Sequence, residues 1–183
     1  MTTGKKDRLS SEDVLKGAVA GLVAGLAAAW VMNQFQAAWS TAAKRMSPPD
    51  DDERRRGGPP QQQIDPNATA MVAQAIAKRT IARSLTKEEL GIAGPAVHYA
   101  FGGSIGALYG ALAEAAPARP TAATGAAYGT LVWIAGDEVA VPLLGLSKPD
   151  SAYPLEAHAQ AWASHIVYGV TTELVRRGVR RLM

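Results

Sequence analysis

Uncharged, mainly apolar stretches alternate with charged ones along the chain. Asp, Glu, Lys and Arg are absent from residues 17–43, 90–113, 120–136 and 157–172. A helix needs about 20 predominantly apolar residues to cross the hydrocarbon core of a bilayer. The first two stretches are long enough outright, and the other two reach that length with the acidic residues at their ends. The pattern predicts an all-α membrane protein, a bundle of four transmembrane helices over residues 14–39, 95–116, 121–141 and 155–175.

A soluble, alanine-rich helical bundle is the main alternative to this interpretation. A helix on the surface of a soluble protein has a polar stripe opposite its apolar one. Residues 17–32 have no such polar stripe on any side. A secretory signal peptide is less favoured, because the uncharged run continues well past the small residues 27–29 that would form its cleavage site. The sequence therefore favours retained membrane spans.

The segments outside the spans differ in their expected structure. Residues 1–13 are a polar tail, and residues 176–183 form a basic C-terminal tail. Residues 44–66 are rich in Pro, Gly, Gln and clustered charges, which predicts a disordered linker. Residues 67–90 have apolar side chains mainly on one side. This segment is predicted to be an amphipathic helix in the first loop, either in the membrane interface or packed on the bundle outside it.

Composition and charge narrow the class of partner. The chain has no cysteine, which excludes disulfides, thiolate metal ligands and a cysteine nucleophile. Its net charge of +3 lies in clusters near the spans, which points to topology and anionic lipid rather than nucleic acid. The expected partners are the lipid bilayer and, as a homo-oligomer, a second copy of the chain. Basic residues in the short segments near the spans favour cytoplasmic termini.

Small residues recur at every fourth position in each predicted span. At this spacing they share one helix face and let two backbones approach closely, as in a glycine zipper. Because lipid tails are as apolar as leucine, packing and polar contacts must hold such helices together. The residues predicted to pack helices are Gly17, Gly21, Gly25, Gly102, Gly106, Gly110, Gly125, Gly129 and Gly169.

Polar and ionisable residues lie at the ends of these rows. With adjacent spans antiparallel, one membrane face collects a candidate polar cluster: Asn33, His98, Asp137, Glu138, His158 and His165. Ionisable groups at membrane depth are costly and usually line an interior or a cavity, so they are candidates for function. We expect His98, Asp137 and His158 to lie within reach of one another around a small cavity. Interfacial histidines bonded to carbonyls, and carboxylates at a helix end, are the structural alternative.

At the opposite membrane face the same rows end in two glutamates. Glu114 and Glu173 lie near Arg119, Arg176 and Arg177 in the predicted arrangement. We expect the arginines to neutralise the glutamates, which favours a structural role for these charges.

Motifs for common chemistries are absent from the sequence. It has no Walker loop, dinucleotide fingerprint, Gly-x-Ser-x-Gly elbow or His-Glu-x-x-His pair. Two histidines and two carboxylates could bind a divalent metal. The di-iron pattern of a Glu-x-x-His pair on each of two helices is absent, however, because Glu156 and His158 have the wrong spacing. No catalytic residue, metal or cofactor is predicted, and an enzyme is the less favoured interpretation.

Several local patterns within the spans occur together. They are an early glycine-rich span ending in Trp, His-Tyr-x-Phe-Gly at residues 98–102, Tyr-Gly-x-x-x-Trp with an acidic pair and Pro-x-x-Gly-Leu over residues 128–146, and His-x-x-Tyr-Gly at residues 165–169 with Glu173 behind it. Together they resemble the YagU-like family of bacterial inner-membrane proteins, a domain of unknown function. The resemblance covers nearly all of the chain outside the linker. It implies a multi-pass inner-membrane location and an association with acid tolerance. Asp137 departs from the family pattern, which often has His before Glu, and this weakens a metal site.

Three hypotheses for function follow. The first is a small membrane protein that supports acid or envelope stress tolerance, with the His/acidic cluster taking up protons, since histidine changes charge near neutral pH. The second is a structural or assembly module that packs through its glycine rows. The third is a small-solute transporter or membrane enzyme. Proton uptake requires His158 and His165 to face inward, whereas a structural role allows them to face loop carbonyls or headgroups.

Overall fold

The computed structural model of the chain describes residues 10–46, 66–116, 118–146 and 154–183. Every regular element in these ranges is a helix, which confirms the all-α class. The predicted tail over residues 1–9 and most of the predicted linker lie outside the described residues. The elements are α1 (Ser11–Met46), α3 (Pro66–Thr80), α4 (Lys87–Ala115), α5 (Ala122–Trp133), the π-helix η1 (Ile134–Ala140), α6 (Val141–Leu143) and α7 (Leu155–Arg180).

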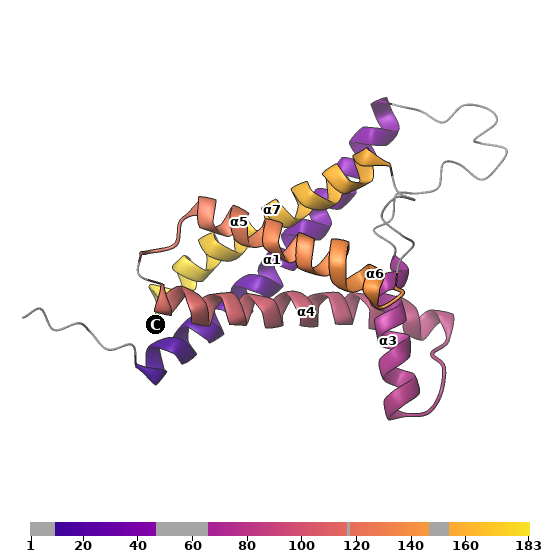
Figure 1. The fold of residues 1–183 in the computed structure, drawn as a ribbon, viewed down its shortest axis with the longest axis horizontal. Helices are drawn as coiled ribbons and strands as arrows, with labels where there is room; N and C mark the ends of the chain where they lie inside the picture. The colour runs from indigo at the N-terminus through magenta and orange to yellow at the C-terminus, as the bar shows by residue number, and fades with distance from the viewer. Residues whose placement is uncertain (1–9, 47–65, 117, 147–153) are drawn as a thin grey trace, which may run out of the picture.

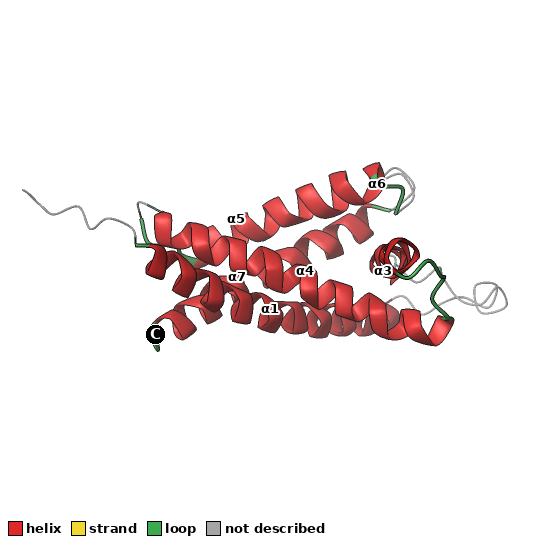
Figure 2. Ribbon diagram, turned by 90° about the horizontal axis from the view of Figure 1, so that it is seen from below, coloured by secondary structure: helices red, strands yellow, loops and turns green. Residues whose placement is uncertain are grey.

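The long helices form an elongated bundle in which successive helices run in opposite directions (Figure 1). α1 packs along both α4 and α7, and α5 packs chiefly along α7. The shorter α3 packs on α4 and lies crosswise to it: Figure 2 shows α3 nearly end-on while the long helices run lengthwise. The centre of the bundle is built from small side chains, since Ala20, Ala24 and Ala28 are fully buried.

The predicted glycine rows lie where helix backbones meet. Along α1 and α4, Gly17 faces Gly110 and Gly21 faces Gly106. Numbers that rise on one helix fall on the other, so the two helices are antiparallel. A Cβ atom on Gly21 would lie under 3.0 Å from the Gly106 carbonyl oxygen, a separation that real Cβ atoms do not show. The same close approach joins α5 to α7, where Gly129 lies against the His165 carbonyl.

α4 begins at Lys87, ahead of the predicted start at Pro95. Thr86 and Glu89 form a capping box: the Thr86 hydroxyl accepts from the Glu89 N–H, and the Glu89 carboxylate accepts from the Thr86 N–H. Arg83 adds a two-pronged ion pair to Glu89. These contacts, led by Arg83, lower the Glu89 pKa to about 2. The cap therefore stays ionised over ordinary pH, and the helix starts there and continues through Pro95.

The helix that begins as α5 changes register before it ends. From Ile134 to Ala140 it is π-helical, and the Val141 N–H bonds the Gly136 carbonyl five residues back. The predicted span ends at residue 141, directly before Pro142, but the helix continues through this proline to Leu143. In an α-helix the proline ring clashes with the carbonyl four residues back, and a wider register relieves that clash. The chain instead ends the helix at Gly145, whose φ of +68° and flanking hydrogen bonds form a Schellman cap.

α7 extends through most of the predicted C-terminal tail. It runs to Arg180, so the arginines of residues 176–180 lie on the last turns of a helix and not on a tail. Their partners lie on other helices, as described below. At the other end of the chain, α1 also exceeds its predicted span and reaches Met46.

Candidate functional site

Two histidines of α7 lie against the two adjacent carboxylates of η1. His158 Nδ1 is 2.9 Å from Glu138 Oε1, and His165 Nδ1 is 3.7 Å from Asp137 Oδ2. Residues seven apart share nearly the same helix face, so α7 presents both histidines on one side. We call these contacts the η1–α7 pairs, and they bring together four residues of the predicted polar cluster.

The π-helical register of η1 explains how neighbouring residues serve the same face. A π-helix closes its hydrogen bonds over five residues instead of four, so it has more residues per turn. Successive side chains therefore diverge less around its axis than in an α-helix. Asp137 and Glu138 can both reach α7 from adjacent positions. Single-turn π segments inside α-helices frequently occur at functional sites.

The hydrogen bond of His165 defines where this side chain can take up a proton. Its Nδ1 lies 2.9 Å from the Ala161 carbonyl oxygen. A carbonyl only accepts hydrogen bonds, so Nδ1 must carry the hydrogen. The second ring nitrogen, Nε2, is then the atom that can bind a proton. The side chain is 10% exposed, and Asp137 is the acidic group beside it.

The remaining predicted cluster residues lie on α1 and α4. The Asn33 side chain donates to the Tyr99 hydroxyl at 3.2 Å, which ties α1 to α4 one residue beyond His98. His98 Nε2 is buried and has no hydrogen-bond partner among the described residues. His98 is close enough to His165 for their charges to interact. The convergence of His98, Asp137 and His158 around one cavity stays a prediction.

A second polar group, the Glu173 network, lies near the start of α1 and the end of α7. The Glu173 side chain is 0% exposed and accepts hydrogen bonds from Arg176, Arg177 and the Tyr109 hydroxyl, the last at 3.0 Å. Arg177 also donates to the Pro120 carbonyl. Two of the arginines expected to neutralise Glu173, Arg176 and Arg177, therefore do so from its own helix.

Two further acids extend the Glu173 network across three helices. Glu114 lies 3.0 Å from Arg180 and 3.5 Å from Arg176, and Arg180 reaches Asp13 at 2.9 Å. The acids come from α1, α4 and α7, and the arginines all come from α7. Among the described residues three carboxylates thus meet three guanidinium groups, so the charges of the network balance, with Glu173 and Arg176 as its buried members.

Most of the chain matches a known protein family. A family model described as "Protein of unknown function (DUF1440)" matches residues 36–174. The chain belongs to this family. Neither a curated protein nor a solved structure matches it. The YagU-like relationship and the association with acid tolerance stay predictions.

The region matched to the DUF1440 family includes both η1–α7 pairs. It contains α4, α5, η1 and Glu173, whereas Asp13 and Arg180 lie outside it. The pairs therefore lie inside the family segment, and the outer part of the Glu173 network lies beyond it.

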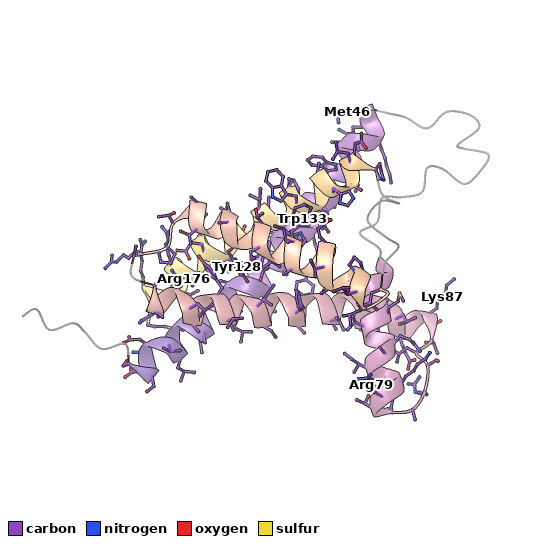
Figure 3. All side chains as sticks on the ribbon, in the orientation of Figure 1. Met46, Arg79, Lys87, Tyr128, Trp133 and Arg176 are labelled. Carbon is purple, nitrogen blue, oxygen red and sulfur yellow. The ribbon has the colours of Figure 1, made fainter. Side chains whose placement is uncertain are left out.

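Three tyrosines of the DUF1440 region form a core feature that sequence reasoning missed. The rings of Tyr109 and Tyr128 stack at 4.3 Å, and Tyr168 lies 6.1 Å from Tyr128. The Tyr168 hydroxyl donates to the Gly102 carbonyl at 2.6 Å. Each tyrosine directly precedes a glycine of the packing rows, so a repeated Tyr-Gly dipeptide marks them in the sequence. Figure 3 shows Tyr128 and Arg176 toward the end of the bundle where the chain ends.

Metal coordination was considered for the acidic and histidine side chains. Within the described parts of this DUF1440 chain, no three His, Asp or Glu side chains lie together as a metal ion would require. The chemistry that the η1–α7 pairs offer is proton binding by an imidazole next to a carboxylate.

Proposed function

We propose that this DUF1440 protein is a four-span protein of the bacterial inner membrane that takes up protons at its η1–α7 pairs and so supports acid tolerance. The observation that carries the proposal is the contact between the buried His165 and Asp137, whose side chain is 30% exposed, in a bundle whose exposed helix sides are mainly apolar. We place both termini in the cytoplasm, and the Asp13–Arg180 contact is in keeping with termini on one side.

The distribution of polar side chains supports a membrane location. Between Lys16 and Gln34 every exposed residue of α1 is apolar, and the same holds for α7 between Glu156 and Arg177. The interior holds the polar groups instead: Gln160, Ser164, His165, Thr172, Glu173 and Arg176 are buried. Water would favour the reverse arrangement, because a soluble surface helix turns its polar stripe outward. Hydrocarbon favours the arrangement found here.

The composition of the helices explains why α1 alone among the described helices meets a hydropathy criterion for a membrane span. Among the described helices, α1 is the one long and apolar enough to cross a membrane by that criterion. The packed glycines and the buried polar side chains of α4 and α7 lower the mean hydropathy of these helices. They do so without adding polar groups to the outer surface. Phe101, Leu108 and Leu112 make the exposed side of α4 mainly apolar, and the hydroxyl of the exposed Ser104 donates to the Ala100 carbonyl. The proposal therefore assigns spans to α4, α5–η1 and α7 by which side faces outward.

The η1–α7 pairs suit uptake of protons better than a purely structural contact does. Each histidine faces a carboxylate. While the imidazole ring is neutral the contact is not an ion pair, and a proton added to the ring makes it one. The charge of an unperturbed histidine changes between about pH 5 and 8, so histidine can respond to mild acid.

Membrane insertion is the first expected result. The protein should stay in the membrane fraction on extraction with alkaline carbonate and should need detergent to remain soluble, because its outer surface is apolar. Fractionation followed by immunoblotting measures this. A monomer that stays in solution without detergent would remove the membrane proposal and the proton site built on it.

Proton uptake by the pairs is the second expected result. The chain has three histidines, so changing His158→Gln and His165→Gln together leaves one. In nanodiscs the double variant should take up about two fewer protons than the native protein between about pH 7.5 and 4.5. Potentiometric titration with 15N-histidine NMR measures this, and survival of cells in acid reports on function.

The single variant His98→Gln is the matched control for that titration. It removes an imidazole whose Nε2 has no hydrogen-bond partner in the described structure, and it leaves both η1–α7 pairs in place. It should keep the proton uptake of the pairs. A folded double variant with unchanged proton uptake and unchanged acid survival would contradict the proposal.

A structural or assembly module is the second candidate, and the backbone contacts favour it. Gly21 meets Gly106, and Gly129 meets the His165 carbonyl, at separations that exclude any side chain. The Glu173 network adds charge pairing at the end of the same bundle. If the protein is a structural module, the η1–α7 pairs only hold η1 against α7. The titration of the double variant then distinguishes this function from proton uptake.

A further inference from the structure

α3 has a position that differs from every long helix of the bundle. It crosses α4 near the end where α4 begins, and it runs across the bundle axis while the other helices follow it (Figures 1 and 2). Its small residues Ala73 and Ala77 are buried, and Ala70 packs on Gly94 of α4. If the bundle axis crosses a bilayer, a helix in this position lies in the plane of the membrane surface.

The side of α3 that faces away from α4 combines apolar and basic groups. Met71 is 42% exposed and Ile76 is 51% exposed, and Ala75 is exposed between them. Lys78 and Arg79 follow on the next turn and are exposed as well, and Figure 3 shows Arg79 on the part of α3 farthest from the bundle. We call these five residues the α3 outer face. Large apolar groups beside cations are typical of helices that lie in a membrane interface.

The charges near the α3 outer face leave its two cations available. Arg83 is held by Glu89, so this pair is neutral as a unit. Lys87 and Glu88 carry opposite charges at the start of α4. Within the described ranges Lys78 and Arg79 form no ion pair. The face thus has a net positive charge that no carboxylate of the described chain neutralises.

We propose that the α3 outer face binds the headgroup region of an anionic phospholipid leaflet, with Met71 and Ile76 inserted at the acyl boundary and Lys78 and Arg79 among the phosphates. This inference rests on the proposed membrane location. The crosswise orientation makes the insertion geometrically possible, and the unpaired cations select anionic over zwitterionic lipid. α3 then acts as an anchor that sets the depth of the bundle.

A label on α3 tests this in the full-length protein. The chain has no cysteine, so Ala75→Cys gives one attachment point for an environment-sensitive fluorophore on the outer face. In proteoliposomes of phosphatidylglycerol and phosphatidylethanolamine, lipids with quenchers near the headgroup should quench the label. In phosphatidylcholine alone the quenching should weaken. Adding Lys78→Gln and Arg79→Gln should shift the equilibrium between inserted and free α3 by up to about 30-fold.

Two controls make each outcome decisive. The variant Arg119→Gln with Arg181→Gln removes the same charge from exposed positions outside α3 and should leave the quenching unchanged. A label at Leu108→Cys, which is exposed near the middle of the proposed span over residues 95–116, should be quenched by mid-chain quenchers in both lipid mixtures. If the Leu108 label is quenched but the Ala75 label is not, or does not respond to lipid charge, the α3 inference is wrong and the membrane proposal stands. If the Leu108 label is not quenched, both are wrong.

Discussion

Replacing Gly21 with alanine should destabilise the bundle, although alanine is the better helix former. A Cβ at this position would come under 3.0 Å from backbone atoms of Gly106 and Gly110. Backbone atoms cannot rotate away as a side chain does, so α1 and α4 would have to separate. Overpacking of this kind costs about 1–3 kcal/mol, and the lost contacts along the whole row add to it. Thermal unfolding in detergent should show a clearly lower midpoint for Gly21→Ala, and a still lower one for Gly21→Leu.

Gly178→Ala is the matched control for this experiment. Gly178 lies in α7, and a Cβ there would meet nothing within 4 Å. The substitution should therefore stabilise the protein by up to about 1 kcal/mol through helix propensity alone. If Gly21→Ala were as stable as Gly178→Ala, the α1–α4 contact would be looser than the structure has it.

The glycine rows can be recognised in the sequence without knowledge of the fold. Spacing by four residues fixes one face of a helix, and antiparallel neighbours then pair Gly17 with Gly110 and Gly25 with Gly102. This period is a local property, so it can be read without knowledge of the fold. The start of α4 was also visible locally, in Thr86 and Glu89. We placed it at Pro95 because a proline usually marks a helix boundary, but the capping box decided the start.

The η1–α7 pairs could be predicted as a group but not pair by pair. Their four residues share one end of the bundle, as the antiparallel arrangement required. The partner of His165 depends on the change from α5 to the π-helix η1, which turns Asp137 and Glu138 toward the same helix. An α-helical projection separates adjacent residues by about 100°, so it cannot assign both to one face.

Long-range charge pairing was hidden for a different reason. The arginines of residues 176–180 form a basic run at the end of the chain, and such a run usually belongs to a solvated tail. Arg180 instead pairs with Asp13, which lies at the opposite end of the sequence. Only the fold brings these two ends together. The same is true of the Tyr109 hydroxyl, whose partner Glu173 lies on another helix.

Removing the carboxylate of Glu173 should have the largest effect of any single polar substitution. The side chain is 0% exposed, and Arg176, Arg177 and the Tyr109 hydroxyl all donate to it. In Glu173→Ala the guanidinium group of Arg176, which is 5% exposed as a residue, keeps only Glu114 at 3.5 Å as an acidic partner. Breaking a buried pair on one side leaves an uncompensated charge and costs about 3–5 kcal/mol. We expect the unfolding midpoint in detergent to fall accordingly.

Two comparisons separate the loss of charge from the loss of volume. Glu173→Gln keeps the shape and one accepting oxygen, so its midpoint should lie between those of the alanine variant and the native protein. Glu12→Gln removes the same charge from the exposed pair of Glu12 and Lys16, where the glutamate side chain is 72% exposed. An exposed pair of this type contributes about 0.5 kcal/mol or less, so Glu12→Gln should leave the midpoint almost unchanged. Equal stability of the Glu173→Ala and Glu12→Gln variants would mean that water reaches the arginines, and that the Glu173 network is a surface feature and not a buried one.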